Sequence, residues 1–158
     1  MTISDVKATE SAELNTENKN LVSYKTKLGS QECKVEYSFL NEKLFSAKYL
    51  IHVHYYNPDL YIKDFMTYSD YLKQKYGTPK LYSEEWIDNT AVKNREVWGN
   101  SIINGDLYLR SQWATATTNI ELLLTRASDG LIYIIIEYSP VTSKPLTKEE
   151  ISKIIEDL

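Results

Sequence analysis

The sequence predicts an α+β fold, in which a curved, mostly antiparallel sheet of about six to eight strands packs helices on its apolar face. Two observations carry this prediction. Apolar and polar residues alternate along several segments, as in strands with one buried face, and residues 57–76 have the apolar spacing of an amphipathic helix. A chain of 158 residues suits one core of ordinary size, so we expect residues 1–158 to form a single domain.

The clearest strand pattern is a hairpin within residues 33–55. Every second residue in each arm is apolar, so the apolar side chains of both arms are expected on one face of the sheet. A three-residue loop keeps those faces together and pairs Val35 with Tyr49 and Phe39 with Phe45. A shift of the register by one residue would turn every apolar side chain toward solvent.

One long central helix is predicted over residues 57–76. Asn57 is a suitable N-cap, Pro58 fits the first helical position, and Gly77 followed by Pro79 ends the helix. Apolar and aromatic residues recur every three or four positions, which predicts a stripe that packs against the sheet: Tyr61, Phe65, Tyr68, Leu72 and Tyr76.

The second half of the chain is predicted to be mostly strand. Residues 81–86 have the composition of a strand, and residues 96–113 are predicted to form a hairpin about their Asn-Gly pair. Residues 119–138 are predicted to form a second hairpin, in which a Ser-Asp-Gly turn pairs Leu124 with Ile134. These segments account for much of the expected sheet.

Short helices are predicted at both ends of the chain. Thr2 and Asp5 resemble a capping box, and residues 147–158 combine a second capping-box pattern with an amphipathic stretch. Both helices are expected on the apolar side of the sheet. Residues 13–20 are polar and are predicted to be a linker.

Composition and charge exclude several classes of function. The net charge is −4 and the basic residues are scattered, whereas a nucleic-acid site needs them clustered. The five glycines include no phosphate-binding or dinucleotide motif, and no cofactor is expected. The single cysteine, Cys33, lies on the apolar face of its predicted strand, where burial would raise the pKa of the thiol and leave it unreactive.

The sequence also contains no segment typical of a membrane protein. No apolar run approaches the roughly 20 residues of a membrane span, and the N-terminus lacks the basic and apolar parts of an export signal. We therefore expect a soluble protein, either cytoplasmic or extracytoplasmic with its signal already removed.

The stretch YLIHVHYYNP contains the two histidines of the chain, His52 and His54. Residues two positions apart on a strand project from the same face, so both imidazoles can reach one metal ion. The hairpin register places Glu32 opposite His52, and two histidines with one carboxylate suit zinc or non-haem iron. The simpler interpretation, which we favour, is that the histidines continue the solvated polar face begun by Ser46 and Lys48.

Tyrosine is unusually abundant, with thirteen residues against three tryptophans and three phenylalanines. Exposed tyrosines are typical of binding surfaces, because the ring supplies apolar area and the hydroxyl supplies a hydrogen bond. Several tyrosines are left after the core stripes are assigned, and four of these are the candidate ligand-binding residues: Tyr55, Tyr56, Tyr82 and Tyr108. The alternative is that the tyrosines build a sheet with a hydrated edge.

Two segments, YLKQKYGTPKLYSEEW and SQWATATTNIELLLTRASDGLIYIIIEY, resemble a group of uncharacterised bacterial α+β domains. In that group a helix ends in Tyr-Gly-x-Pro, and a Trp, a Thr-rich link, an Ile/Leu strand and a strand ending in Glu-Tyr follow. The resemblance covers most of the chain. Because the group has no assigned activity, the resemblance implies a fold and no functional residue.

The sequence therefore predicts a non-catalytic binding or protein-interaction domain, whose partner is a protein or a small-molecule ligand. Two alternatives stay open. One is a metal-dependent enzyme that uses His52, His54 and Glu32. The other is an inhibitor or immunity-type protein, which a small, acidic, tyrosine-rich chain would suit.

Overall fold

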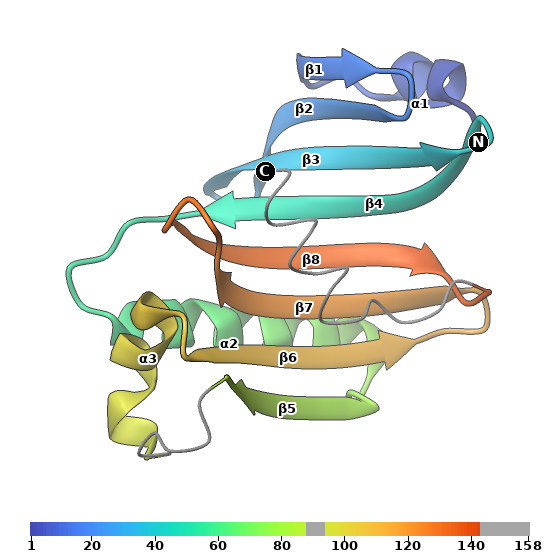
Figure 1. Cartoon of the computed structure of the whole chain (residues 1–158). Helices are drawn as coiled ribbons and strands as arrows, with labels where there is room; N and C mark the ends of the chain where they lie inside the picture. The colour runs from blue at the N-terminus through green and yellow to red at the C-terminus, as the bar shows by residue number, and fades with distance from the viewer. Residues whose placement is uncertain (88–93, 143–158) are drawn as a thin grey trace.

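A computed structural model describes residues 1–87 and 94–142 as an α+β structure built on one eight-stranded sheet (Figure 1). The strand order is β1-β2-β3-β4-β8-β7-β6-β5, and all neighbouring strands are antiparallel. The sheet is not closed, because β1 and β5 form separate edges. The strands are β1 (Glu13–Asn18), β2 (Leu21–Leu28), β3 (Gln31–Leu40), β4 (Lys43–His52), β5 (Leu81–Trp86), β6 (Leu107–Ala114), β7 (Thr118–Arg126) and β8 (Ile132–Pro140). The helices in the described residues are α1 (Ile3–Thr9), α2 (Asp59–Tyr76) and α3 (Trp98–Asn104), with a 3₁₀ turn, η1 (Arg95–Val97).

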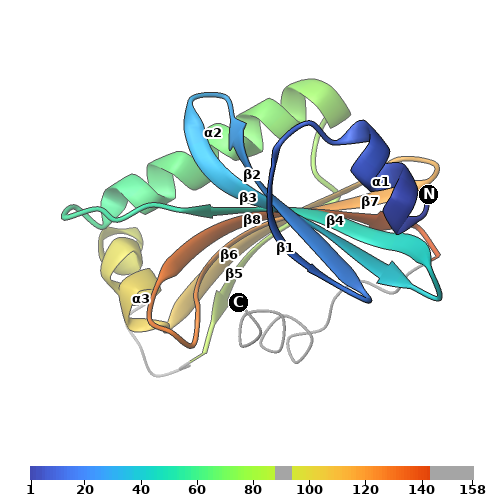
Figure 2. The same cartoon turned by 90° about the horizontal axis from the view of Figure 1, so that it is seen from above.

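Helices α1 and α2 pack against the same face of the twisted sheet (Figure 2). Val6 of α1 is buried against β2 and β3, where Val22, Tyr24 and Val35 surround it. α2 contributes Phe65 and other residues to the main core, whose buried members are Ile51, Tyr61, Ile62, Phe65, Leu72, Trp98, Ile102, Leu107, Leu109, Trp113, Ile120, Leu122, Leu124, Ile132, Ile134 and Ile136. The apolar side of the sheet thus carries the helices, as the alternation pattern predicts.

The C-terminal end of α2 follows the predicted cap, whereas the helix begins at Asp59, one residue later than predicted, with Pro58 in the N-cap position and no side-chain cap. Asn57 Oδ1 accepts a hydrogen bond from the Asp59 N–H at 3.0 Å, and the Gly77 N–H donates to the Lys73 carbonyl at 2.8 Å. Gly77 has a φ of 81°, which a residue with a side chain adopts only with strain. The description of one long central helix is not confirmed, because α2, the longest helix in the described residues, has 18 residues.

The β3–β4 hairpin has the predicted register over most of its length, with Val35 paired to Tyr49. The turn is wrong in detail, because it contains two residues, Asn41 and Glu42, with φ values of 50° and 64°. Such a turn matches the right-handed twist of the strands, and a bulge beyond it shifts the register by one residue. Phe39 therefore pairs with Leu44, and Phe45 is 39% exposed rather than part of the core.

The predicted hairpin over residues 96–113 is wrong in its first arm, where the chain forms α3. Trp98 and Ile102 are buried four positions apart on this helix. Gly105 has a φ of 80°, and the N–H groups of Gly105 and Asp106 donate to the carbonyls of Ile102 and Ser101 at 3.0 and 2.8 Å. This pattern is a Schellman cap, so the Asn-Gly pair ends a helix instead of turning a hairpin.

Two further predictions about strands have opposite outcomes. The β7–β8 hairpin is confirmed, since Leu124 pairs with Ile134 and the turn glycine, Gly130, has a φ of 85°. The predicted linker over residues 13–20 is wrong, because β1 occupies residues 13–18 as an edge strand. All of β1 is exposed, so its side chains lack the alternation that marks a half-buried strand.

At the chain ends, the N-terminal prediction is confirmed. Thr2 and Asp5 form a reciprocal capping box at the start of α1. The predicted helix at residues 147–158 lies outside the described residues.

Candidate functional site

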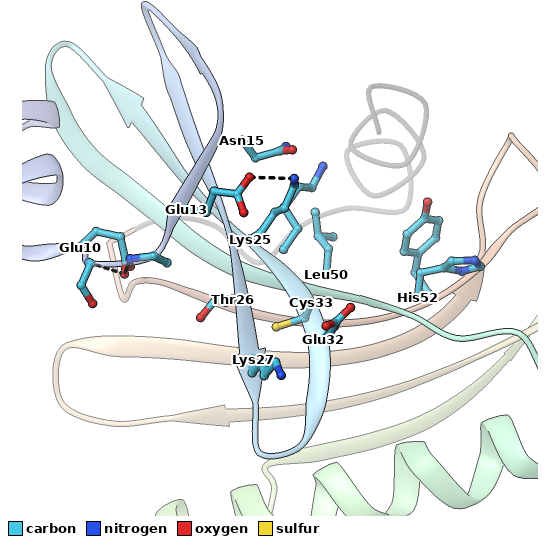
Figure 3. A pocket seen from close by; sticks show the side chains of 14 residues that line it. Glu10, Glu13, Asn15, Lys25, Thr26, Lys27, Glu32, Cys33, Leu50 and His52 are labelled. Carbon is cyan, nitrogen blue, oxygen red and sulfur yellow. Dashed lines mark hydrogen bonds and ion pairs between the residues drawn. The ribbon is translucent and has the colours of Figure 1, made fainter.

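Two hollows contain residues that the sequence singles out. The larger, which we call the charged groove, has a volume of about 730 Å³ and is drawn in Figure 3. It runs over β2, β3 and β4 and the link between α1 and β1. Its lining residues are Glu10, Ser11, Ala12, Glu13, Asn15, Lys25, Thr26, Lys27, Glu32, Cys33, Lys34, Leu50, His52 and Tyr133.

Most charged groups of the charged groove already have a partner within the protein. Lys25 pairs with Glu13 at 3.0 Å, and Lys34 pairs with Glu36 at 2.8 Å. The Glu10 carboxylate accepts a hydrogen bond from the Tyr37 hydroxyl at 2.9 Å. The lining carries three glutamates and three lysines, so the groove as a whole offers little net charge to a ligand.

The cysteine in the charged groove is not an activated nucleophile. Burial raises the pKa of the Cys33 thiol above its ordinary value. The thiol therefore stays protonated near neutral pH, whereas nucleophilic attack and metal binding require the thiolate.

The structure places Glu32 and His52 in the charged groove, on neighbouring strands (Figure 3). His54 is not among the lining residues of this groove. His52 Nδ1 lies 3.0 Å from the Ile132 carbonyl oxygen, to which it can donate a hydrogen bond. Nε2 is then the ring nitrogen whose lone pair could coordinate a metal ion. His54 follows the end of β4, and its ring packs 5.7 Å from that of Tyr56. Across residues 1–87 and 94–142, no three His, Cys, Asp or Glu side chains are grouped closely enough to hold a metal.

The second hollow, which we call the tyrosine pocket, has a volume of about 450 Å³. It lies between the β2–β3 turn and the outer side of α2, and Tyr55 reaches it from the segment that joins β4 to α2. Its lining residues are Leu28, Gly29, Ser30, Gln31, Tyr55, Asp64, Thr67, Tyr68 and Tyr71. A pocket of this size is within the range of small-molecule sites.

Hydrogen bonds fix one wall of the tyrosine pocket. The Tyr55 hydroxyl donates to Asp64 Oδ2 at 2.5 Å, and this bond raises the pKa of Tyr55 to about 12. The Tyr55 N–H donates to the Tyr61 hydroxyl at 3.0 Å, and the two rings meet edge to face at 5.1 Å. Tyr61 is buried in the core, so Tyr55 is anchored from both its backbone and its side chain.

The four candidate tyrosines do not form one site. Tyr55 lines the tyrosine pocket, whereas Tyr56 is 99% exposed and lies outside it. Tyr82 is on the exposed edge strand β5, paired with Ser111. Tyr108 packs on the opposite face of the sheet and donates a hydrogen bond to Glu85 Oε2 at 2.6 Å.

Of the residues that shape the tyrosine pocket, sequence reasoning did not assign Asp64, Tyr68 and Tyr71 to a binding site. Tyr68 has the spacing of the core stripe, and it lies at the edge of that stripe rather than at its centre. A helical signal was available, because Asp64, Tyr68 and Tyr71 are four and three positions apart and share one side of α2. The grouping of a carboxylate with two aromatic rings could therefore be predicted from the helical spacing alone, without the structure of the sheet.

The face of the sheet opposite α2 carries an unexpected row of charged residues, most of them buried. Its members are direct cross-strand partners on β3, β4, β8 and β7: Glu36, Lys48, Glu137 and Glu121. Glu36 pairs with Lys48, as the pairing of Val35 with Tyr49 requires, but this part of the polar face is buried, with Lys48 only 5% exposed. Arg110 of β6 ends the row, and its Nε lies 2.7 Å from Glu121 Oε1 as an ion pair without hydrogen-bond alignment.

We expect the free energy of unfolding to fall as the pH rises through the folded-state pKa values of Glu121 and Glu137. Burial raises both pKa values above the ordinary 4.5. An acid with a raised folded-state pKa stabilises the fold fully below its ordinary pKa, and this stabilisation is lost as the pH rises through the raised value. Urea unfolding at a series of pH values from about 4 to about 8 measures the slope. In the double variant Glu121→Gln, Glu137→Gln, the free energy of unfolding should vary less with pH. An unchanged slope would contradict the assignment of the pH dependence to these two carboxyl groups.

Comparisons of the chain with protein-family models, curated proteins and solved structures gave no match. The resemblance to uncharacterised bacterial domains therefore stays a prediction, and the inference of function rests on the residues themselves. The helices within residues 1–87 and 94–142 are too short or too polar to cross a membrane.

Proposed function

We propose that this chain is a non-catalytic binding domain whose small-molecule ligand, or the side chain of whose protein partner, occupies the tyrosine pocket. The observation that carries the proposal is the grouping of Tyr55, Tyr68 and Tyr71 with Asp64 around one hollow of about 450 Å³. Aromatic walls with one or two fixed polar groups are what ligand pockets commonly provide.

The bonding of Tyr55 and the fixed walls of the pocket support binding rather than acid–base catalysis. Tyr55 has a pKa of about 12 and already donates its proton to Asp64, so its hydroxyl stays protonated and fixed near neutral pH. Tyr55 is held by buried Tyr61, and the other aromatic walls lie on α2. The pocket is therefore already formed before a ligand binds. A preformed site loses less entropy on binding. The charged groove offers less, because its three lysines are balanced by three glutamates and Lys25 and Lys34 are already ion-paired.

The proposal predicts that a small molecule shifts the amide resonances of the tyrosine pocket in two-dimensional NMR spectra. We would screen a fragment library containing neutral, anionic and cationic members against the full chain, and follow Gly29, Asp64 and Tyr68. Tyr71→Ser should weaken binding of each hit about fivefold or more, because a ring wall is removed.

Tyr56→Ser is the matched control for that screen. Tyr56 is 99% exposed and Tyr71 is 61% exposed, so neither substitution should change the thermal midpoint appreciably. Only Tyr71 lines the pocket. The proposal fails when no fragment shifts the pocket resonances, or when the two variants bind the hits equally well.

A further inference from the structure

We propose that the ligand group held in the tyrosine pocket is an organic cation, a methylated ammonium such as a quaternary ammonium, placed against Asp64 and the tyrosine rings. This inference rests on the proposed function, and it adds the chemical class of the ligand. Four observations carry it. They are the charge of the pocket lining, the arrangement of the tyrosine rings, the hydrogen bonding of the Asp64 carboxylate, and the cations that contact other aromatic rings of the chain.

The charge of the lining favours a cation. Asp64 is the one charged residue among the described lining residues of the tyrosine pocket. Within residues 1–87 and 94–142, no Lys, Arg or His lies within ion-pair distance of Asp64. The helix cannot supply one either, because the residues three and four positions away are Leu60, Tyr61, Thr67 and Tyr68. A half-buried carboxylate with this environment attracts a cation and repels an anion.

The rings provide the remaining attraction. Tyr68 and Tyr71 have their centroids 6.4 Å apart with planes at 75°, so they form two walls of a corner beside Asp64. A cation within about 6 Å of a tyrosine face is attracted by the negative charge of the π system, and this attraction grows when water is excluded. A carboxylate and ring walls in one hollow are the combination that organic cations require.

The bonding of Asp64 selects among cations. Oδ2 already accepts the Tyr55 hydroxyl at 2.5 Å, so only Oδ1 is without that bond. A guanidinium binds a carboxylate best through two parallel N–H bonds, one to each oxygen, and here it would have to share Oδ2 with the Tyr55 hydroxyl. A methylated ammonium has no such requirement, because it carries few or no N–H donors and gains its binding energy from charge and ring contact.

Two other aromatic rings of the chain are in contact with a cationic side chain of the protein itself. Lys75 Nζ lies 5.1 Å from the Tyr76 ring centroid, and the Arg95 guanidinium lies 5.3 Å from that of Trp98. In the part of the chain that the structure describes, no comparable contact involves the rings of the tyrosine pocket. These rings therefore remain available to a cation from outside.

The test compares choline with its neutral isostere 3,3-dimethylbutan-1-ol, by NMR titration of the full chain. Both have the same shape and hydroxyl, so the positive charge is the only large difference. We expect choline to bind at least about tenfold more tightly, with affinity that falls as salt is added. Asp64→Asn keeps an acceptor for Tyr55 and should lower choline affinity about tenfold while leaving the neutral isostere unaffected.

Asp70→Asn is the matched control, since Asp70 is an exposed aspartate on the same helix that pairs with Lys73 at 3.2 Å and does not line the pocket. It should leave choline binding unchanged. Should Asp64→Asn fail to fold, Tyr71→Phe and Tyr71→Leu take its place. The phenylalanine variant should retain choline affinity, and the leucine variant should lose about fivefold or more.

The outcomes separate this inference from the proposed function. Equal binding of choline and its isostere, or tighter binding of a methyl glycoside than of choline, overturns the cation while the pocket remains a binding site. Tighter binding of unmethylated lysine amide than of its ε-trimethylated form overturns the methylated ammonium. A pocket that no library member perturbs overturns both the ligand class and the proposed function.

Discussion

Lys48→Met should lower the free energy of unfolding by about 3 kcal/mol at pH 8. Lys48 lies between two glutamates, with Glu36 as its partner on β3 and Glu137 as its partner on β8. All three are buried, with Glu137 only 7% exposed. Attraction to Lys48 lowers the pKa of Glu137 against the larger opposing effect of burial. Methionine keeps the volume and removes the charge, so Glu137 is left buried without its cation.

The loss should shrink at low pH, which distinguishes a charge effect from a packing effect. Below the folded-state pKa of Glu137 the carboxyl is protonated, and it no longer needs a cation. Urea unfolding of both proteins at about pH 8 and about pH 5 gives the comparison. Lys25→Met is the matched control, because the Lys25 side chain is 61% exposed and pairs with the exposed Glu13. It should change stability by about 0.5 kcal/mol or less. An equal loss at both pH values would show that the lysine acts through packing alone.

The sequence predicts the pairing of the interior strands well because apolar residues recur at every second position on their helix-covered face. Val35 and Tyr49 pair as expected, since a slip by one residue would expose the apolar side of both strands. Leu124 and Ile134 pair as expected for the same reason. Burial of the second face is not predictable from the same pattern. Lys48 occupies a polar position in the alternating pattern of its strand, which predicts contact with solvent, yet it is only 5% exposed. The tertiary structure decides which groups cover this side chain.

The wrong predictions share a cause, which is that a local pattern allows two structures. An Asn-Gly pair can turn a hairpin or end a helix, and the choice at Gly105 depends on the burial of Trp98 and Ile102 against α2 and the sheet. A polar edge strand such as β1 has no apolar alternation, and only its hydrogen bonds to β2 define it. Packing decides both cases.

The candidate site was predictable in composition but not in grouping. The abundance of tyrosine predicts a binding surface, and one of the four candidate tyrosines, Tyr55, lines the tyrosine pocket. The partners of Tyr55 come from α2 and from the β2–β3 turn, which the sequence places far from it. Since three separate segments meet at the tyrosine pocket, only the folded chain shows that Asp64 and Tyr55 are bonded.

Gly99→Ala should destabilise the protein by about 2 kcal/mol, although alanine is the better helix former. Gly99 is buried in α3, where this helix crosses the start of α2. A Cβ at this position would lie 2.7 Å from Pro58 Cβ and 2.8 Å from the Pro58 carbonyl carbon. The second contact is with backbone, so the strain can be relieved only by moving α3 away from α2. Such a movement would loosen Trp98 and Ile102 in the main core.

Asn100→Ala provides the control that separates helix propensity from packing. Asn100 is the next residue in α3 and is exposed, so alanine there should leave stability unchanged or raise it by about 0.5 kcal/mol. Opposite signs at two adjacent positions of one helix cannot come from helix propensity, which favours alanine at both. Chemical unfolding of the two variants beside the parent chain measures both signs. A stabilising Gly99→Ala would mean that α3 is not held against Pro58 as closely as the structure places it, and that the Asn-Gly end of this helix is less tightly fixed to the core.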